Sequence, residues 1–444
     1  MSRHCKTLEK DYQIPTVGAA AANIVEYAMG YNFLYTNGMP IRYVGFPFPV
    51  AGQPKSVHRQ YVEGNDEVSG KPMMTAIIDA LTQPLTEEEK HSGPPPEAAP
   101  EPRLLGPDTA DNLQRLFKEK DWTDYNPIIL PTEERVAELL TGTSRKPEEL
   151  ITELTWPGGK RPFTVEKAAV CAVMAGAKKE YFPLILALAT QVPFGNSTSS
   201  MANMIMVNGP IRNELGMNYG GNALGPHNEV NAVIGRVYTL MSKTAGNLHH
   251  GKTTFSSLGS NLQYNNLCIA ENEEGLPEGW DPFHVQMGFK PSDSVVTVGT
   301  GWTYISSVGE VQRAYPAQLL MRDYMRSLTG MRGGTILMDP TVAALLKNEQ
   351  GFDTKLMLSE WLAENVEKTV ASFWGNGVIS TFFTSMALQG LEPYAGYLKL
   401  PEDELIKPMT ARGIQIIAVG GGIQTTWFVT DFGLGRGVLV DEWR

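Results

Sequence analysis

The residues most able to do chemistry gather in a glycine- and asparagine-rich stretch from Val207 to Arg236, in which 12 of 30 residues are Gly or Asn. Such loops expose backbone N–H groups and side-chain amides, and they often form a small-molecule site at the mouth of a helix. Asn208 and Gly209 follow a predicted buried strand over 205–207, and open α/β sheets bind ligands at the carboxyl ends of their strands. We therefore predict a substrate site here.

Three side chains of this stretch are candidate substrate ligands besides Asn208. Asn208 and Asn222 could hydrogen-bond a carboxylate or a carbonyl, Asn231 could orient a small polar substrate, and Arg236 could pair with an anion or brace the loop. The alternative for Asn208 and Asn222 is a structural role in capping a turn. Asn231 and Arg236 flank the apolar stripe of a predicted helix on opposite sides, so both cannot point at one small ligand.

Two residues are candidate proton carriers. Glu271 follows a short apolar strand over 267–270, and alternation places it on the same face as Glu273. A buried carboxylate at a strand end could act as a general base, although a structural salt bridge is the alternative. His227 lies just before the predicted helix and is the histidine best placed for acid–base work. No HxxH or HExxH spacing occurs, so the metal signal is weak, and whether a metal ion binds stays open.

A second glycine cluster, Gly420 to Gly422, follows a predicted strand over 414–419. The backbone of Gly421 and Gly422 could hold an anion with its N–H groups. The cluster is neither a P-loop nor a dinucleotide GxGxxG motif, and a tight strand–helix turn explains it nearly as well.

The composition excludes several classes of protein. The 444-residue chain carries a formal net charge of −11, which argues against nucleic acid and anionic membranes as partners. No apolar run approaches the roughly 20 residues of a transmembrane helix, and the N-terminus lacks the apolar core of a signal peptide. Three cysteines without a CxxC pair indicate reduced thiols in the cytoplasm.

The pattern of elements predicts an α/β protein in two parts. Residues 1–83 alternate helix and strand, which implies parallel pairing with a right-handed crossover. No strand precedes the first helix, so we expect an incomplete doubly wound, flavodoxin-like unit that a partner chain completes. Seven prolines make 84–107 a linker.

The region 108–444 is expected to be a larger mixed α/β domain that carries the Gly/Asn-rich loop. Its predicted helices include one capped by Thr132, one over 146–154, two separated at Pro183, and one capped by the side chain of Asn228. Later elements are expected as strands over 294–298, 335–338 and 414–419 and helices over 315–328, 340–347 and 354–372.

Several motifs resemble the UGSC-like proteins, which are named for a Sec/Cys-Gly-Ser-Cys motif. The resemblance lies in VNGPI, GGNALGP, NAVIGR and CIAENEE within 207–274, and in QIPTVG and VGFPFPV within 13–50. The motif that names the family does not occur in this chain. The resemblance implies thiol or selenol chemistry, either redox or nucleophilic, or a cysteine that holds a metal.

Together these observations predict the large subunit of a hetero-oligomeric cytoplasmic enzyme that acts on a small polar molecule. A small partner subunit would supply a thiol or a metal-bound cysteine, and the active site would lie between its thiol turn and the Gly/Asn loop. The alternatives are a non-catalytic binding or scaffold subunit and a free-standing enzyme that binds an anionic ligand at Gly420–Gly422.

Overall fold

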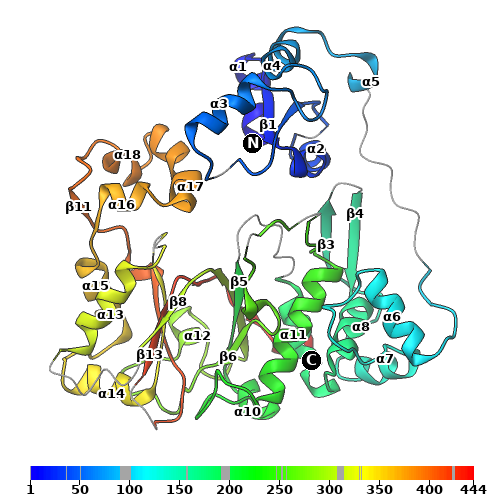
Figure 1. Cartoon of the computed structure of the whole chain (residues 1–444). Helices are drawn as coiled ribbons and strands as arrows, with labels where there is room; N and C mark the ends of the chain where they lie inside the picture. The colour runs from blue at the N-terminus through cyan, green and yellow to red at the C-terminus, as the bar shows by residue number, and fades with distance from the viewer. Residues whose placement is uncertain are drawn as a thin grey trace.

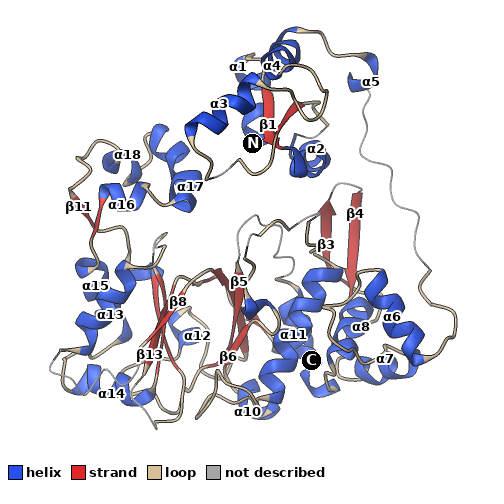
Figure 2. Cartoon of the chain, in the orientation of Figure 1, coloured by secondary structure: helices blue, strands red, loops and turns tan. Residues whose placement is uncertain are grey.

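The chain folds into an N-terminal unit and a larger body that carries two mixed sheets (Figure 1). The computed structural model describes residues 2–36, 38–50, 52–90, 102–156, 159–191, 201–246, 248–251, 254–256, 258–307, 315–329, 331, 333–422 and 426–444. The N-terminal unit lies at the top of Figure 1, and helices and strands are mixed throughout, as Figure 2 shows. The expected α/β class is confirmed at this level. Within the described residues, no helix is long and apolar enough to cross a membrane.

The N-terminal unit contains a two-stranded parallel sheet, in which β1 (Val17–Ala21) pairs with β2 (Arg42–Phe46). Helix α2 (Ala22–Thr36) makes the crossover between the two strands, as the sequence predicts. The remaining helices of this unit and the segment after it are α1 (Ser2–Tyr12), α3 (Lys55–Glu63), α4 (Met73–Thr82) and α5 (Glu87–Lys90). Alternate residues of β2 pack on opposite faces of the sheet. Ile41 and Tyr43 join a cluster with α1 and α2, whereas Val44 packs against α4.

The first sheet of the body has the strand order β14–β7–β5–β6, with β15 also paired to β7. Strand β5 is parallel to β6 and antiparallel to β7. The strands are β5 (Ala202–Asn208), β6 (Leu267–Ala270), β7 (Val295–Gly301), β14 (Gly433–Leu434) and β15 (Val438–Leu439). The helices of this half are α6 (Ala110–Glu119), α7 (Glu133–Leu140), α8 (Val165–Ala175), α9 (Phe182–Ala189), α10 (Ile211–Leu215) and α11 (Glu229–Thr244). Helices α8, α9 and α11 build the largest core with β5 and β7, because their facing residues are apolar.

The second sheet has the order β12–β9–β13–β8, and β12 and β9 are parallel. Its strands are β8 (Tyr304–Ser306), β9 (Gly334–Met338), β12 (Ile414–Ala418) and β13 (Trp427–Thr430). Its helices are α13 (Ala317–Arg326), α14 (Pro340–Asn348) and α15 (Lys355–Asn365), followed by α16 (Val370–Trp374), α17 (Gly377–Leu388) and α18 (Tyr394–Tyr397). Short pieces complete the fold: α12 (Phe283–Gln286), β10 (Lys368–Thr369) and β11 (Leu405–Ile406).

Local signals placed several of these elements correctly. The side chain of Thr132 accepts a hydrogen bond from the backbone N–H of Arg135 and caps α7. Pro183 lies in the first turn of α9, and the chain between α8 and α9 ends one helix and starts another, as predicted.

Three expectations about elements were wrong. The predicted helix over 146–154 is instead strand β3 (Leu150–Trp156), because antiparallel pairing with β4 (Gly159–Thr164) overrides local helix preference. The predicted helix over 354–372 is two helices, because the Thr369 hydroxyl caps a new helix by accepting from the N–H of Ser372. Asn228 occupies the N-cap position of α11, but its side chain makes no capping hydrogen bond there.

Candidate functional site

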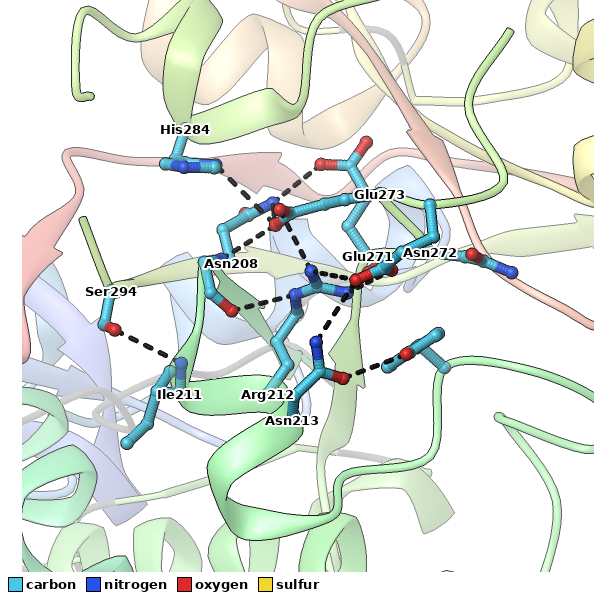
Figure 3. Close-up of polar contacts among 12 residues, drawn as sticks. Asn208, Ile211, Arg212, Asn213, Glu271, Asn272, Glu273, His284 and Ser294 are labelled. Carbon is cyan, nitrogen blue, oxygen red and sulfur yellow. Dashed lines mark hydrogen bonds and ion pairs between the residues drawn. The ribbon is translucent and has the colours of Figure 1, made fainter. Parts of the chain in front are cut away.

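A buried polar cluster lies where β5 and β6 end, at the start of α10. We call it the polar centre and define it as Asn208, Arg212, Glu271, Glu273 and His284, most of whose contacts Figure 3 shows. Strands β5 and β6 are parallel, so their carboxyl ends meet at one edge of the sheet. This geometry brings the ends of the Asn208 strand and the Glu271 strand together, at the edge of the sheet where open α/β folds bind ligands.

Glu271 is the most enclosed acid of the polar centre, with an exposed fraction of 0%. One carboxylate oxygen accepts a hydrogen bond from Lys355 Nζ at 2.6 Å. The other accepts from Asn208 Nδ2 and from the backbone N–H of Phe283, both at 2.7 Å. Lys355 is the first residue of α15 and is itself buried, so the ion pair joins the first sheet to a helix of the second sheet. The contacts of Glu271 are therefore those of a structural residue that holds the two sheets together.

Glu273 lies closer to solvent, with a side-chain exposure of 13%. Its Oε1 accepts from Asn208 Nδ2 at 3.0 Å and from the N–H of Gly209 at 2.7 Å, and its Oε2 pairs with Arg212 at 3.0 Å. Gly209 has φ +82°, and a Cβ there would lie 2.0 Å from the carbonyl oxygen of Asp293. Only glycine fits this position, and its conformation aims the amide at Glu273.

Arg212 ties the loop to the strand end. Its buried guanidinium donates to the backbone carbonyls of Gly209 and Glu271, and it forms ion pairs with Glu273 and Glu274. The group also stacks over the ring of Tyr219 at 4.9 Å. Burial by itself would raise the pKa of Glu274, but hydrogen bonds from Arg212 and other donors lower it.

His284 is fully buried, and neither of its ring nitrogens has a hydrogen-bond partner among the described residues. Its Nδ1 lies 3.7 Å from Glu273 Oε1. The Oδ1 of Asn208 is buried and likewise finds no partner within the described residues, and the two donor contacts of Nδ2 fix which amide atom is the oxygen. Buried polar atoms left unpaired cost about 1–3 kcal/mol each, and the described residues also hold such atoms outside the polar centre, for example in Ser242 and Trp427.

The Gly420–Gly422 turn packs directly against the Gly/Asn loop. The N–H of Gly420 donates to the carbonyl of Tyr219 at 2.9 Å. A Cβ on Gly421 would lie 2.4 Å from the backbone nitrogen of Gly221, so the two glycine segments touch backbone to backbone. Asn272 joins them to β6, since its Nδ2 donates to the carbonyl of Gly420 at 2.8 Å. Two stretches predicted separately thus form one junction.

The same turn is poorly suited to an anion. The N–H of Gly422 donates to Asp339 Oδ2 at 2.8 Å, and this carboxylate also caps α14. Since the Gly420 and Gly422 amides are bonded within the chain and a carboxylate lies beside them, an anionic ligand would meet repulsion.

The other predicted ligands have structural contacts. Asn231 is buried, and its side chain accepts from the backbone N–H of Asn218 and donates to the carbonyl of Asn218, both at 3.0 Å. Arg236 makes a two-point ion pair with Asp124 and donates to the carbonyl of Pro127. Asn222 is exposed, has φ +62° and donates to the carbonyl of Pro226, which is a turn-capping contact. His227 is exposed in the loop before α11, with φ +76°, whereas Glu271 is fully buried.

Sequence reasoning missed two members of the polar centre, Arg212 and His284, and the residue Lys355 that pairs with Glu271. Arg212 lies inside the Gly/Asn stretch, and its position four residues after Asn208 was a usable signal. His284 follows a proline-rich turn and carries no motif. Lys355 lies 84 residues from Glu271, and no local pattern connects the two.

The chain's own cysteines are enclosed. All three are free and buried. Burial raises the pKa of Cys268 to about 12 and that of Cys171 to about 11, so both remain thiols near neutral pH. Among the described residues, no group of three or more His, Cys, Asp or Glu side chains could hold a metal ion.

The polar centre and the N-terminal unit lie at opposite ends of the molecule. In Figure 1, α10 is at the bottom and α1 to α4 are at the top. The N-terminal unit touches the other end of the body, where the rings of Tyr27 and Phe255 meet at 6.1 Å and α2 lies near β3. A group bound within the N-terminal unit therefore lies away from the Gly/Asn loop of the same chain.

Comparisons of the chain with models of protein families, with curated proteins and with solved structures found no match.

Proposed function

We propose that this chain is the large subunit of an enzyme that acts on a small polar molecule, bound where the Gly/Asn loop meets the polar centre. The observation that carries the proposal is that His284 and the Oδ1 of Asn208 are buried next to Glu273 and have no hydrogen-bond partner in the part of the chain that the structure describes. Open α/β folds place ligand sites at such strand ends. Glu273, as the partly exposed acid of the polar centre, takes a proton from the ligand and returns it.

The charges of this region favour a ligand with N–H groups. Three carboxylates, Glu271, Glu273 and Glu274, face the two cations Arg212 and Lys355. The unpartnered atom of Asn208 is an acceptor. A small amine or amide supplies the donors that these groups lack, whereas an anion would meet an excess of acceptors.

The reactive thiol, or a metal-bound cysteine, comes from a small partner subunit in this proposal. Cys171 and Cys268 support this view, because their raised pKa values keep them protonated and their burial keeps them from substrate. Since the N-terminal unit lies at the other end of the chain, the thiol reaches the polar centre from the N-terminal unit of a second copy or from another part of the partner. The resemblance to UGSC-like proteins is consistent with such chemistry.

A thermal-shift panel tests the site on the full chain. The probes are small primary amines and amides, compared with carboxylic acids of the same size. We expect amines or amides to raise the unfolding temperature of the wild type. Gly421→Ala should abolish the effect, because its Cβ displaces the Gly221 backbone, whereas Gly106→Ala has open space around it and should not. His227→Ala should also leave the shift unchanged.

A scaffold subunit is the second candidate, and the bracing contacts of Glu271 favour it. In that case no small molecule shifts the unfolding temperature. Glu273→Gln and Asn222→Ala would also leave the turnover of a reconstituted complex unchanged. Lost turnover in Glu273→Gln with normal assembly would exclude the scaffold reading.

A further inference from the structure

A groove of about 770 Å³ runs along the outer side of β2 in the N-terminal unit. This unit lies at the end of the molecule opposite α10, beside which the polar centre lies (Figure 1). It is lined by residues of α2, β2, α4 and α5. Its apolar lining includes Met29, Met39, Ile41, Val44 and Ala76. The side chain of Met29 is 50% exposed there.

The groove occupies the place where an α/β sheet would continue. Helices cover both faces of the sheet, because Ile41 packs toward α1 and α2 and Val44 packs toward α4. Among the described residues the sheet has only the strands β1 and β2, and residues of α2 and α4 line the groove beside β2. A sheet of two strands is marginally stable, and three or more strands with covered faces are the usual solution.

Internal contacts define how much of β2 borders the groove. The N–H of Gly45 donates to Asp66 Oδ1 at 2.7 Å, and the carbonyl of Gly45 accepts from the N–H of Glu67 at 3.0 Å. The turn at 66–67 therefore closes the groove at the carboxyl end of β2. Before this turn, the residues from Ile41 to Val44 line the groove along β2.

The rim of the groove is acidic. Its two basic side chains are already paired, Arg42 with Glu89 at 2.7 Å and Lys71 with Asp79 at 2.7 Å. Arg42 also donates to the carbonyls of Gln83 and Pro84, which fixes the α5 side of the groove. Two further acids, Glu26 and Glu88, line the groove and are exposed to solvent. The charge of the groove thus complements a cationic occupant.

We propose that this groove binds an extended apolar segment flanked by Lys or Arg, which a partner chain contributes and which lies beside residues 41–44 as an additional strand. The inference rests on the partner subunit of the proposed function and states where that partner docks. The apolar residues of the segment cover Met29, Ile41 and Val44, and its basic residues face Glu26 and Glu88.

Photo-crosslinking of the full-length chain in its source organism tests this docking. The crosslinker p-benzoylphenylalanine replaces Met29 in the groove or, as the matched control, Met74, which is 49% exposed on α4 and does not line the groove. We expect the Met29 position to label one segment of a different chain, whose sequenced peptide is apolar between basic residues. The Met74 position should not label it.

Charge variants decide whether the rim acts as inferred. Glu26→Lys with Glu88→Lys should lower the crosslink yield about ten-fold, and the neutral Glu26→Gln with Glu88→Gln should lower it less. Three labelling results would overturn the inference: labelling of a second copy of this chain, equal labelling from both positions, or no labelled segment. A crosslink yield that is the same in the charge variants and in the wild type would also overturn it. The amine-induced thermal shift at the polar centre is measured on the same variants. It should persist, so failure of the groove and failure of the proposed function give different results.

Discussion

The buried ion pair between Lys355 and Glu271 should hold the two halves of the body together. Lys355 Nζ lies 2.6 Å from Glu271 Oε1, and the side chains are 2% and 0% exposed. Lys355→Met removes the cation and leaves the Glu271 carboxylate with Asn208 and the Phe283 amide as its donors among the described residues. Glu271→Gln removes the negative charge and leaves a buried ammonium without a counter-charge.

The magnitude follows from what each change leaves behind. Breaking a buried pair by removing one partner costs about 3–5 kcal/mol, because the remaining charge stays desolvated. The double variant leaves neither charge, so its loss should be smaller than the sum of the single losses by about 2 kcal/mol or more. The surface pair between Lys407 and Glu364, at 2.8 Å with side chains 47% and 73% exposed, is the matched control. Its loss should cost at most about 1 kcal/mol.

Urea unfolding of the four proteins in the cycle, followed by fluorescence, measures these free energies. The wild type, both single variants and the double variant are compared at one pH and one salt concentration. Strictly additive losses would show that the two groups do not interact as the structure has them. Single losses as small as those at the Lys407 pair would refute the argument from burial.

Three further outcomes are expected. Burial alone would raise the pKa of Asp121, but hydrogen bonds from Lys243, His249 and Tyr125 lower it from 3.8 to about 2. The ionised carboxylate therefore stabilises the fold above about pH 4, and this stabilisation is lost as the pH falls toward 2. Asp121→Asn should thus cost roughly 2 kcal/mol at pH 7 and almost nothing at pH 2, as thermal unfolding across that range would show; a loss independent of pH would contradict it. Gly235→Ala should lower the free energy of unfolding by about 3 kcal/mol in urea titrations, since its Cβ would lie 1.7 Å from the carbonyl oxygen of Asn265. A Cβ at Gly377 meets open space, so the control variant Gly377→Ala should change this free energy by less than about 1 kcal/mol. In a Cys5→Ser background, a thiol reagent at pH 8 should label Cys171 and Cys268 only after unfolding, because burial raises both pKa values; rapid labelling of the folded protein would show that the thiols are accessible.

Signals within a few residues of each other predicted much of the fold. The cap at Thr132, the break at Pro183 and the parallel crossover between β1 and β2 depend on local conformation or on short connections, and the structure contains all three. Strand β3 was missed because a strand is stabilised by its neighbour, and the preference of residues 150–154 alone does not report that pairing.

For the candidate site, the sequence by itself determined where to look and the tertiary structure decided what each residue does. The density of glycine and asparagine located the loop, because those residues allow the required backbone conformations and close approaches. Only packing brought Gly421 against Gly221, gave Glu271 its ion pair with Lys355, and left His284 buried beside Glu273. Such contacts depend on how two sheets dock, and residues that meet across that junction carry no common spacing in the chain.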